Sequence, residues 1–351
     1  MRNNNTNDLH LLSETVNMVR FPMAVLVVFI HTCSTHIDLT DISHIIYQLI
    51  RAFFSSVLGQ VAVPTFFLIS GYLFYQNLDK WNWQIYFEKL KRRICSLFVP
   101  YIIWNTLYIF FALTGAIYSV VFKGTSYTVL TDWIKTQGLF HLYWDGIYLV
   151  PLWFVRDLMM IVLFAAVIYV YVRYLRIFSI LLSIVLYFFC DFIPYSFVFF
   201  IIGSYFSLFR EKVNYLFNSR IRLIVILVFM NTLLLNIYCM YVNSEILEVF
   251  QKCNVLIGVF AVMSIGYEMK MRWTVPSRFW IESSFFVFVF HYFMCHDVSR
   301  IVRYMIGTNS QIQLIMVYFL SNFIVVCSCI ITYMLFNKFM PKVLKVLVGG
   351  R

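Results

Sequence analysis

Residues 19–34 read "VRFPMAVLVVFIHTCS", an apolar run with a cation near its start and an imidazole well inside it. An apolar run of about 20 residues is typical of a helix that crosses a membrane. Ionisable side chains are costly inside a bilayer and usually serve a function there, so Arg20 and His31 need an explanation. The rest of the sequence decides whether this run is one membrane span among several.

The composition excludes a soluble protein. Hydrophobic residues make up 62% of the 351 residues and charged residues 12%, whereas soluble domains average about 45–50% apolar and about 25% charged residues. The eight cysteines lie mostly in apolar runs and show no CxxC or zinc-type spacing, so no metal site is expected. The N-terminus lacks the pattern of a cleavable signal peptide.

Apolar runs bounded by charges and turn residues predict an all-α, polytopic membrane protein with about ten transmembrane helices. Three segments are expected: a cytoplasmic N-terminal tail over residues 1–19, a transmembrane domain over 20–336 and a basic cytoplasmic C-terminal tail over 337–351. The fifth and sixth spans are the shortest. The predicted spans are 20–36, 53–75, 96–118, 151–172, 177–190, 193–209, 221–242, 249–267, 279–296 and 312–336.

The distribution of Lys and Arg sets the orientation. With both termini in the cytoplasm, 20 of the 27 basic residues fall on the cytoplasmic side, six fall outside and Arg156 lies within a span. This bias follows the positive-inside rule. Membrane topology thus explains the net charge of +11, and we expect no nucleic-acid partner.

Arg20 and His31 are eleven residues apart, which is three turns of an α-helix. Both therefore project from one face, about 16 Å apart along the helix axis. One interpretation is a cytoplasmic anchor plus a histidine bonded to a neighbouring helix. The other is a channel with a phosphate-binding mouth and, further in, an imidazole that accepts a proton.

Other polar residues lie within the predicted spans. His291 in "FWIESSFFVFVFHYF" has a depth similar to that of His31, so the two can belong to one site or make separate helix–helix bonds. In "PLWFVRDLMM", Trp153, Arg156 and Asp157 are either structural or orient a substrate. Because adjacent residues on a helix do not face each other, Arg156 and Asp157 should each have a partner on another helix.

Two further stretches leave alternatives open. Lys89, Lys91, Arg92 and Arg93 form a cytoplasmic basic cluster, which either reflects topology or binds an anion. The loop over residues 119–150 is rich in aromatic residues, typical of an interfacial segment or of a surface that stacks on sugar rings.

Several motifs occur in a fixed order along the chain: Arg-x10-His at Arg20 and His31, "VPTFFLISGYLF", a basic run followed by "VPYIIW", "PLWFVRDL" and "SSFFVFVFH". Together they resemble the acyltransferase 3 family of bacterial membrane O-acyltransferases, over roughly residues 15 to 340. The resemblance implies about ten helices in the bacterial plasma (inner) membrane. It also implies an acyl-CoA donor in the cytoplasm and O-acetylation, or related acylation, of a surface or lipid-linked carbohydrate.

The resemblance also implies roles for particular residues. Arg20 and His31 match the family's Arg–His pair, with His31 as the catalytic residue. Lys89, Arg92 and Arg93 match its basic motif, although many members have arginine where this chain has Lys89. Many members also have tyrosine where this chain has Phe288. No permanently bound cofactor is expected, since acetyl-CoA or another acyl-CoA is a substrate, and the sequence leaves open whether the chain forms a homo-oligomer.

Two functions of other classes compete with acyl transfer. A polysaccharide or lipid-linked-sugar transporter would use the same buried charges to guide its substrate, and a polymerase would join lipid-linked sugar repeats. No pair of matching halves with broken helices, a common transporter signature, is evident in the sequence. The register of Arg20 and His31 favours acyl transfer over both.

Overall fold

The computed structural model describes residues 2–32, 42–76, 78, 80–123, 138, 140–145, 147–190, 192–209, 218–242, 244–274 and 276–350. Within these residues the regular structure is entirely helical, which confirms the all-α prediction. The longer helices are α1 (Arg2–Thr32), α3 (Ala62–Tyr75), α4 (Trp83–Arg93), α5 (Val99–Lys123), α7 (Trp153–Leu163), α8 (Ala165–Leu175), α9 (Ile177–Phe189), α10 (Tyr195–Leu208), α12 (Ser219–Tyr241), α13 (Leu247–Arg272), α14 (Arg278–Phe290), α15 (Cys295–Ile306) and α16 (Gln311–Phe339).

Each predicted span coincides with helical structure over most of its described residues; residues 33–36 of the first span lie outside them. Among the described residues, six helical segments are long and apolar enough to cross a membrane, or eight if each of two bent pairs is one span. The bent pairs are α7 with α8, at 68°, and α14 with α15, at 62°. α9 and α10 are shorter apolar helices. The count of ten spans remains a prediction.

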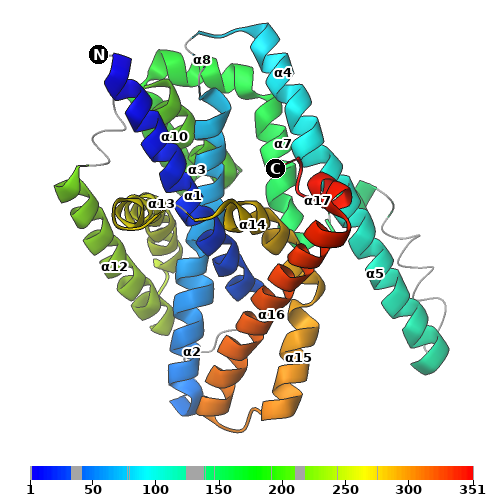
Figure 1. Cartoon of the computed structure of the whole chain (residues 1–351). Coiled ribbons are helices and arrows are strands. Elements are labelled where there is room, and N and C mark those ends of the chain that lie inside the picture. Colours follow the sequence, from blue (N-terminus) through cyan, green and yellow to red (C-terminus); the bar gives the residue numbers. More distant parts are fainter. Residues whose placement is uncertain are drawn as a thin grey trace.

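Two glycines allow α3 and α10 to pack with their backbones in contact, next to α1 near the middle of the molecule (Figure 1). A Cβ added at Gly71 would lie 2.1 Å from the carbonyl oxygen of Phe200, and one added at Gly203 would lie 2.0 Å from that of Leu68. Small residues at such crossings let membrane helices approach closely. This crossing fixes the centre of the bundle.

Short irregular helices lead into or interrupt several spans. A π-helical stretch, η2 (Ala52–Leu58), and a 3-10 turn, η3 (Gly59–Val61), connect α2 (Ile45–Arg51) to α3, and a second π-helical stretch, η4 (Ile94–Phe98), joins α4 to α5. The 3-10 turn η8 (His291–Phe293) lies at the break between α14 and α15. π-Helical segments often occur at functional sites.

Both predicted tails are helical over most of their described residues and pack with the bundle. α1 is one continuous helix from Arg2 to Thr32, and α17 (Pro341–Leu347) follows α16 and packs on α5. Trp104 of α5 donates a hydrogen bond of 3.0 Å to the carbonyl of Leu347. Figure 1 shows the C-terminus folded back toward α5 and α7.

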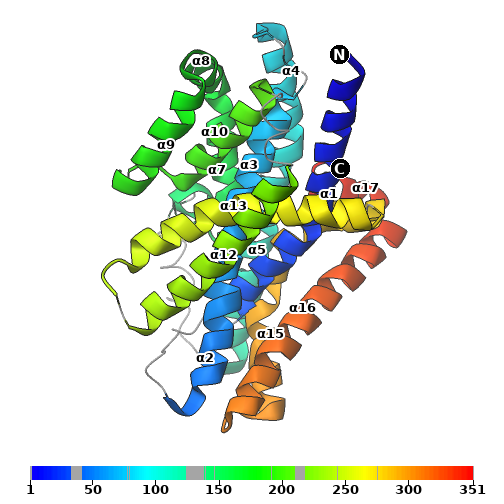
Figure 2. The ribbon, with the colours of Figure 1, turned by 90° about the vertical axis from the view of Figure 1, so that its left-hand side faces the viewer.

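α13 lies across the neighbouring helices, and Figure 2 shows it running nearly at right angles to α3. Ion pairs hold it to two helices: Lys270 pairs with Glu14 of α1 at 2.9 Å, and Glu268 pairs with Arg222 of α12 at 2.6 Å. α13 thus packs against α1 and α3, and α12 packs against α13.

Candidate active site

Two histidines from distant parts of the chain meet where α1 ends. The rings of His31 and His291 are 5.4 Å apart between centroids, with an interplanar angle of 35°. Tyr292 also packs edge-on against His31, with centroids 5.4 Å apart. The break between α14 and α15 brings η8 against the end of α1 and so creates this pair.

The hydrogen bonds of His291 define which of its ring nitrogens is free. The ring is fully buried, and Nδ1 lies 3.0 Å from the carbonyl oxygen of Val287. Because a carbonyl only accepts, Nδ1 must donate, and in a neutral ring Nε2 then carries a lone pair. Within the described part of the chain Nε2 has no hydrogen-bond partner. His291 therefore presents an unused base beside His31.

A row of side chains leads from this pair toward the surface. Tyr292 is half-buried. Its ring centroid lies 5.6 Å from that of the exposed His296 and 5.6 Å from that of Tyr108 in α5. The sequence interpretation did not single out Tyr292 or His296. The available signal was the second histidine five residues after His291.

Arg20 and Arg93 line a common cavity of about 130 Å³ among α1, α3, α4, α7 and α14. Two hydroxyl groups, from Ser70 and Ser284, also line it. Arg20 and His31 both lie on the side of α1 that faces α14 and η8, as their three-turn spacing predicts. The cavity and the histidine pair therefore lie on one face of α1, with Arg20 and His31 about 16 Å apart along the helix axis.

The other residues of the predicted basic motif have different surroundings. Lys89 donates to the backbone carbonyls of Phe74 and, at 3.2 Å, Gln76, so it closes the C-terminal end of α3. Arg92 is exposed on α4. Of this motif, Arg93 is the residue that shares the cavity with Arg20.

Comparison with known families gives the chain an assignment. The sequence model of an acyltransferase domain, acyltransferase 3, matches residues 14–334, nearly the whole chain. The chain belongs to this acyltransferase 3 family. It is a multi-pass membrane protein and an acyltransferase. No curated protein and no solved structure shows a significant match to it.

The prediction for Arg156 and Asp157 in this acyltransferase was wrong in one respect. Their side chains pair with each other, at 2.8 Å between Nη2 and Oδ1, because the long arginine side chain curls back along α7. Each also has a partner elsewhere, as expected: Arg156 donates to the carbonyl of Trp144, and Ser196 of α10 donates to Asp157 at 3.3 Å. The pair therefore links α7 to α10 and to the segment around Trp144, which precedes α7.

Trp153 lies away from the histidine pair of the acyltransferase. Its ring packs against Tyr195 of α10, at 5.7 Å between centroids, and against Phe67 of α3, at 6.2 Å. Phe288, where the resemblance led us to expect tyrosine in many members, packs on Phe154 and lines the arginine cavity. That cavity therefore has no phenol at this position.

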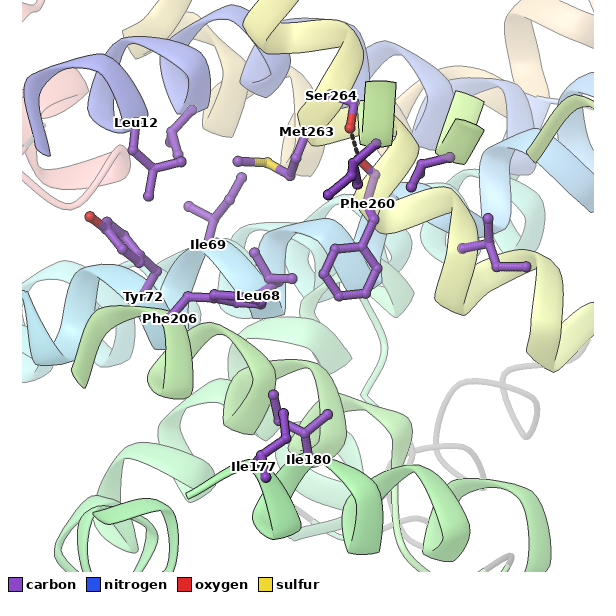
Figure 3. Close-up of a pocket in the computed structure, with 14 residues that line it drawn as sticks. Leu12, Leu68, Ile69, Tyr72, Ile177, Ile180, Phe206, Phe260, Met263 and Ser264 are labelled. Carbon is purple, nitrogen blue, oxygen red and sulfur yellow. Dashed lines mark hydrogen bonds between the residues drawn. The ribbon is translucent and has the colours of Figure 1, made fainter. Parts of the chain in front are cut away.

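A larger cavity of about 410 Å³ lies elsewhere and is almost wholly apolar. Figure 3 shows Leu12, Ile69 and Phe260 around it, with Ser264 bonded to the backbone of its own helix. In the described residues no three His, Cys, Asp or Glu side chains gather as metal ligands.

Proposed function

We propose that this acyltransferase moves an acyl group from cytoplasmic acyl-CoA to a hydroxyl of a surface or lipid-linked carbohydrate, in the bacterial inner membrane. The observation that carries the proposal is the pairing of two sites along one face of α1. A cavity with two arginines lies at the level of Arg20, and two imidazoles lie near the C-terminal end of α1. In this proposal the Arg20 side is the cytoplasmic one, as the distribution of basic residues predicts. A donor that spans this distance would present its thioester to His31.

Arg20 and Arg93 bind phosphate groups of the donor. Guanidinium groups suit phosphate because their paired N–H donors match its oxygens. The cavity, of about 130 Å³, is smaller than the range of about 300–1,000 Å³ typical of small-molecule sites, so a whole nucleotide does not fit inside it. The nucleotide therefore stays at the mouth, where Arg92 adds positive charge and Lys89 holds the end of α3 in place.

His31 acts as the general base. It takes the proton of the sugar hydroxyl as that oxygen attacks the thioester carbonyl; the new C–O bond forms, the C–S bond breaks, and the CoA thiolate takes up a proton. General base catalysis typically contributes about 10²–10⁴ in rate. The same geometry also permits His31 to attack the thioester itself. The acyl group then passes from CoA to the imidazole and from the acyl-imidazole to the sugar hydroxyl.

His291 orients His31. Its Nε2 is a buried acceptor beside the His31 ring, so a small rotation of His31 lets that ring donate an N–H to it. The other nitrogen of His31 is then held as a lone-pair base. His291 is a positioning residue in this scheme.

Acylation of surface polysaccharide tests the proposal. Cells carrying the gene, lacking it, or carrying His31→Ala are compared by mass spectrometry of the polysaccharide before and after mild base. We expect an acyl mass that requires both the gene and His31, and its value identifies the group. Unchanged acylation in cells without the gene would refute the proposal.

One observation favours a transporter as the second candidate. The two bent spans, α7–α8 and α14–α15, are the kind of broken helix that lines transporter sites. A transporter predicts polysaccharide trapped inside cells that lack the gene, with its acylation unaltered. Specific binding of acyl-CoA by the purified protein favours acyl transfer, since a transporter does not need it.

A further inference from the structure

A second polar cavity, of about 530 Å³, lies outside the site described above. It is lined by the last turns of α9 and α12, the first turns of α10 and α13, and the stretch from η2 into α3. Its volume falls in the range of about 300–1,000 Å³ typical of small-molecule sites. In the proposed orientation, all five of these helix ends face the outside, as does the end of α1 that carries His31.

The cavity is separated from the end of α1 by one helical stretch. Ser56 and Gln60 of η2 and η3 line it, whereas Ser55 and Gly59 of the same stretch face α1. Ser55 donates to the carbonyl of Phe29 at 2.6 Å. One helix is about 10 Å across, so the cavity and the His31 end of α1 are neighbours on the same side.

A buried amide oxygen in the cavity wall lacks a partner. Asn236 is fully buried, and its Nδ2 donates to the carbonyls of Thr232 at 2.8 Å and Phe250 at 3.1 Å. Its Oδ1 has no hydrogen-bond partner among the described residues. A buried acceptor left unpaired costs free energy, and neighbouring atoms shield this one from the cavity, so it marks a polar stretch of the wall and is not itself a contact for a ligand.

The remaining lining groups favour a neutral, hydroxyl-rich ligand. Glu248 and Lys252 neutralise each other in an ion pair of 2.8 Å. Gln60 and Gln251 offer amide donors and acceptors, and the rings of Tyr187 and Tyr195 contribute to the wall, with the Lys252 ammonium 5.9 Å from the Tyr187 ring centroid. Amides around an aromatic wall, without net charge, match a sugar ring, which has polar edges and apolar faces.

From these features we infer that this cavity binds a sugar unit of the acceptor carbohydrate next to the unit that is acylated. The inference rests on the proposed function, because it assumes that the acceptor is a carbohydrate outside the membrane. The chain of sugars passes from the cavity around the η2–η3 stretch to the end of α1. Binding in the cavity holds the acceptor in place without taking part in the chemistry at His31.

Kinetics with oligosaccharide acceptor test this inference. The acceptor is surface polysaccharide from the producing cells, freed of acyl groups by mild base and cut to short oligosaccharides. Gln60→Trp fills the cavity from an exposed position and removes no buried hydrogen bond, and Gln251→Ala removes an amide from the lining of the cavity. Gln84→Trp, at an exposed position on α4, is the matched control.

We expect both cavity variants to raise the KM for oligosaccharide roughly tenfold, while kcat and the KM for acyl-CoA change less than about twofold. The control should match the wild type. An unchanged KM for oligosaccharide in both cavity variants would overturn the inference even if the wild type transfers acyl groups normally.

Direct binding separates failure of this inference from failure of the proposed function. The oligosaccharide is titrated against the His31→Ala protein, with and without Gln60→Trp, and binding is followed by tryptophan fluorescence or calorimetry. Saturable binding that Gln60→Trp weakens roughly tenfold supports the cavity, whether or not transfer is observed. Absent binding, or binding that Gln60→Trp leaves unchanged, overturns it.

Discussion

His31 and His291 have different environments although their rings are neighbours. His31 is at the end of α1 beside Tyr292, whereas His291 is wholly buried and tied to its own helix through Nδ1. The similar depth of the two residues in the sequence predicted that they can share a site. The break at η8, which turns the His291 ring toward α1, carries no Pro or Gly and could not be predicted from the sequence.

We expect His291→Ala to lower kcat by about 10–100-fold while the KM for acyl-CoA changes little, because His291 orients the base and does not hold the donor. His291→Gln, which retains a side-chain acceptor, should recover part of the loss. Steady-state kinetics of both variants check this. Equal losses for Ala and Gln would show that a hydrogen-bond acceptor is not what matters at this position.

The arginine cavity makes a prediction about donor binding. Arg93→Ala should raise the KM for acyl-CoA by about 10–100-fold, since a charge-assisted hydrogen bond contributes about 1.5–3 kcal/mol. Arg92→Ala, at an exposed position on the same helix, should raise it only slightly. Steady-state kinetics give the KM for acyl-CoA of the two variants, and competition binding with CoA compares their affinities. Equal effects of the two variants would mean that the basic run acts only through its overall charge.

The sequence identified the charged and imidazole side chains around the proposed site, but it did not predict all of their contacts. The spacing of Arg20 and His31 placed them on one helix face, and the structure confirms this. The role of Lys89 at the end of α3 depends on how α4 folds back, which no local pattern encodes. The pairing of Arg156 with Asp157 was missed because the rule for neighbours on a helix ignores the reach of a long arginine side chain.

Among the helices, the crossing of α3 and α10 is the tightest contact and depends on glycine. Gly71→Ala or Gly203→Ala would place a methyl group at about 2 Å from a backbone carbonyl of the partner helix, and backbone cannot yield as a side chain does. Overpacking of this kind typically costs about 1–3 kcal/mol. We expect a clear fall in the unfolding temperature in detergent for both variants.

Gly115→Ala in α5 is the matched control for that prediction. A Cβ added there would meet no atom within 4 Å. Because alanine is a better helix former than glycine, this variant should keep or slightly raise the unfolding temperature. A similar fall for all three variants would contradict the close crossing.

Helix positions followed from the apolar runs, whereas helix breaks did not. Over their described residues the predicted spans coincide with helix almost throughout, because hydrophobicity and length largely decide where a chain can cross a bilayer. The bends between α7 and α8 and between α14 and α15 occur at Phe164 and Met294, without a breaker residue. Packing between helices sets these bends, so they belong to tertiary structure.

The orientation of the whole chain in the membrane rests on its basic residues. If both termini are cytoplasmic, Thr308 in the turn before α16 faces outside and Ser277 in the turn before α14 faces the cytoplasm. Both residues are exposed. In a cysteine-free background, an impermeant maleimide should label Thr308→Cys in intact cells, and Ser277→Cys only after permeabilisation. The reverse pattern would invert the topology and with it the assignment of donor and acceptor sides.

The central claim is that an acyl group crosses from a donor on the arginine side to an acceptor on the histidine side of one membrane. The most direct measurement uses proteoliposomes of uniform orientation, with isotope-labelled acyl-CoA on the cytoplasmic side and de-acylated polysaccharide only on the opposite side. We expect label on the polysaccharide with the wild type and none with His31→Ala, although both proteins bind acyl-CoA. Transfer that persists in His31→Ala, or that requires donor and acceptor on the same side, would contradict the account.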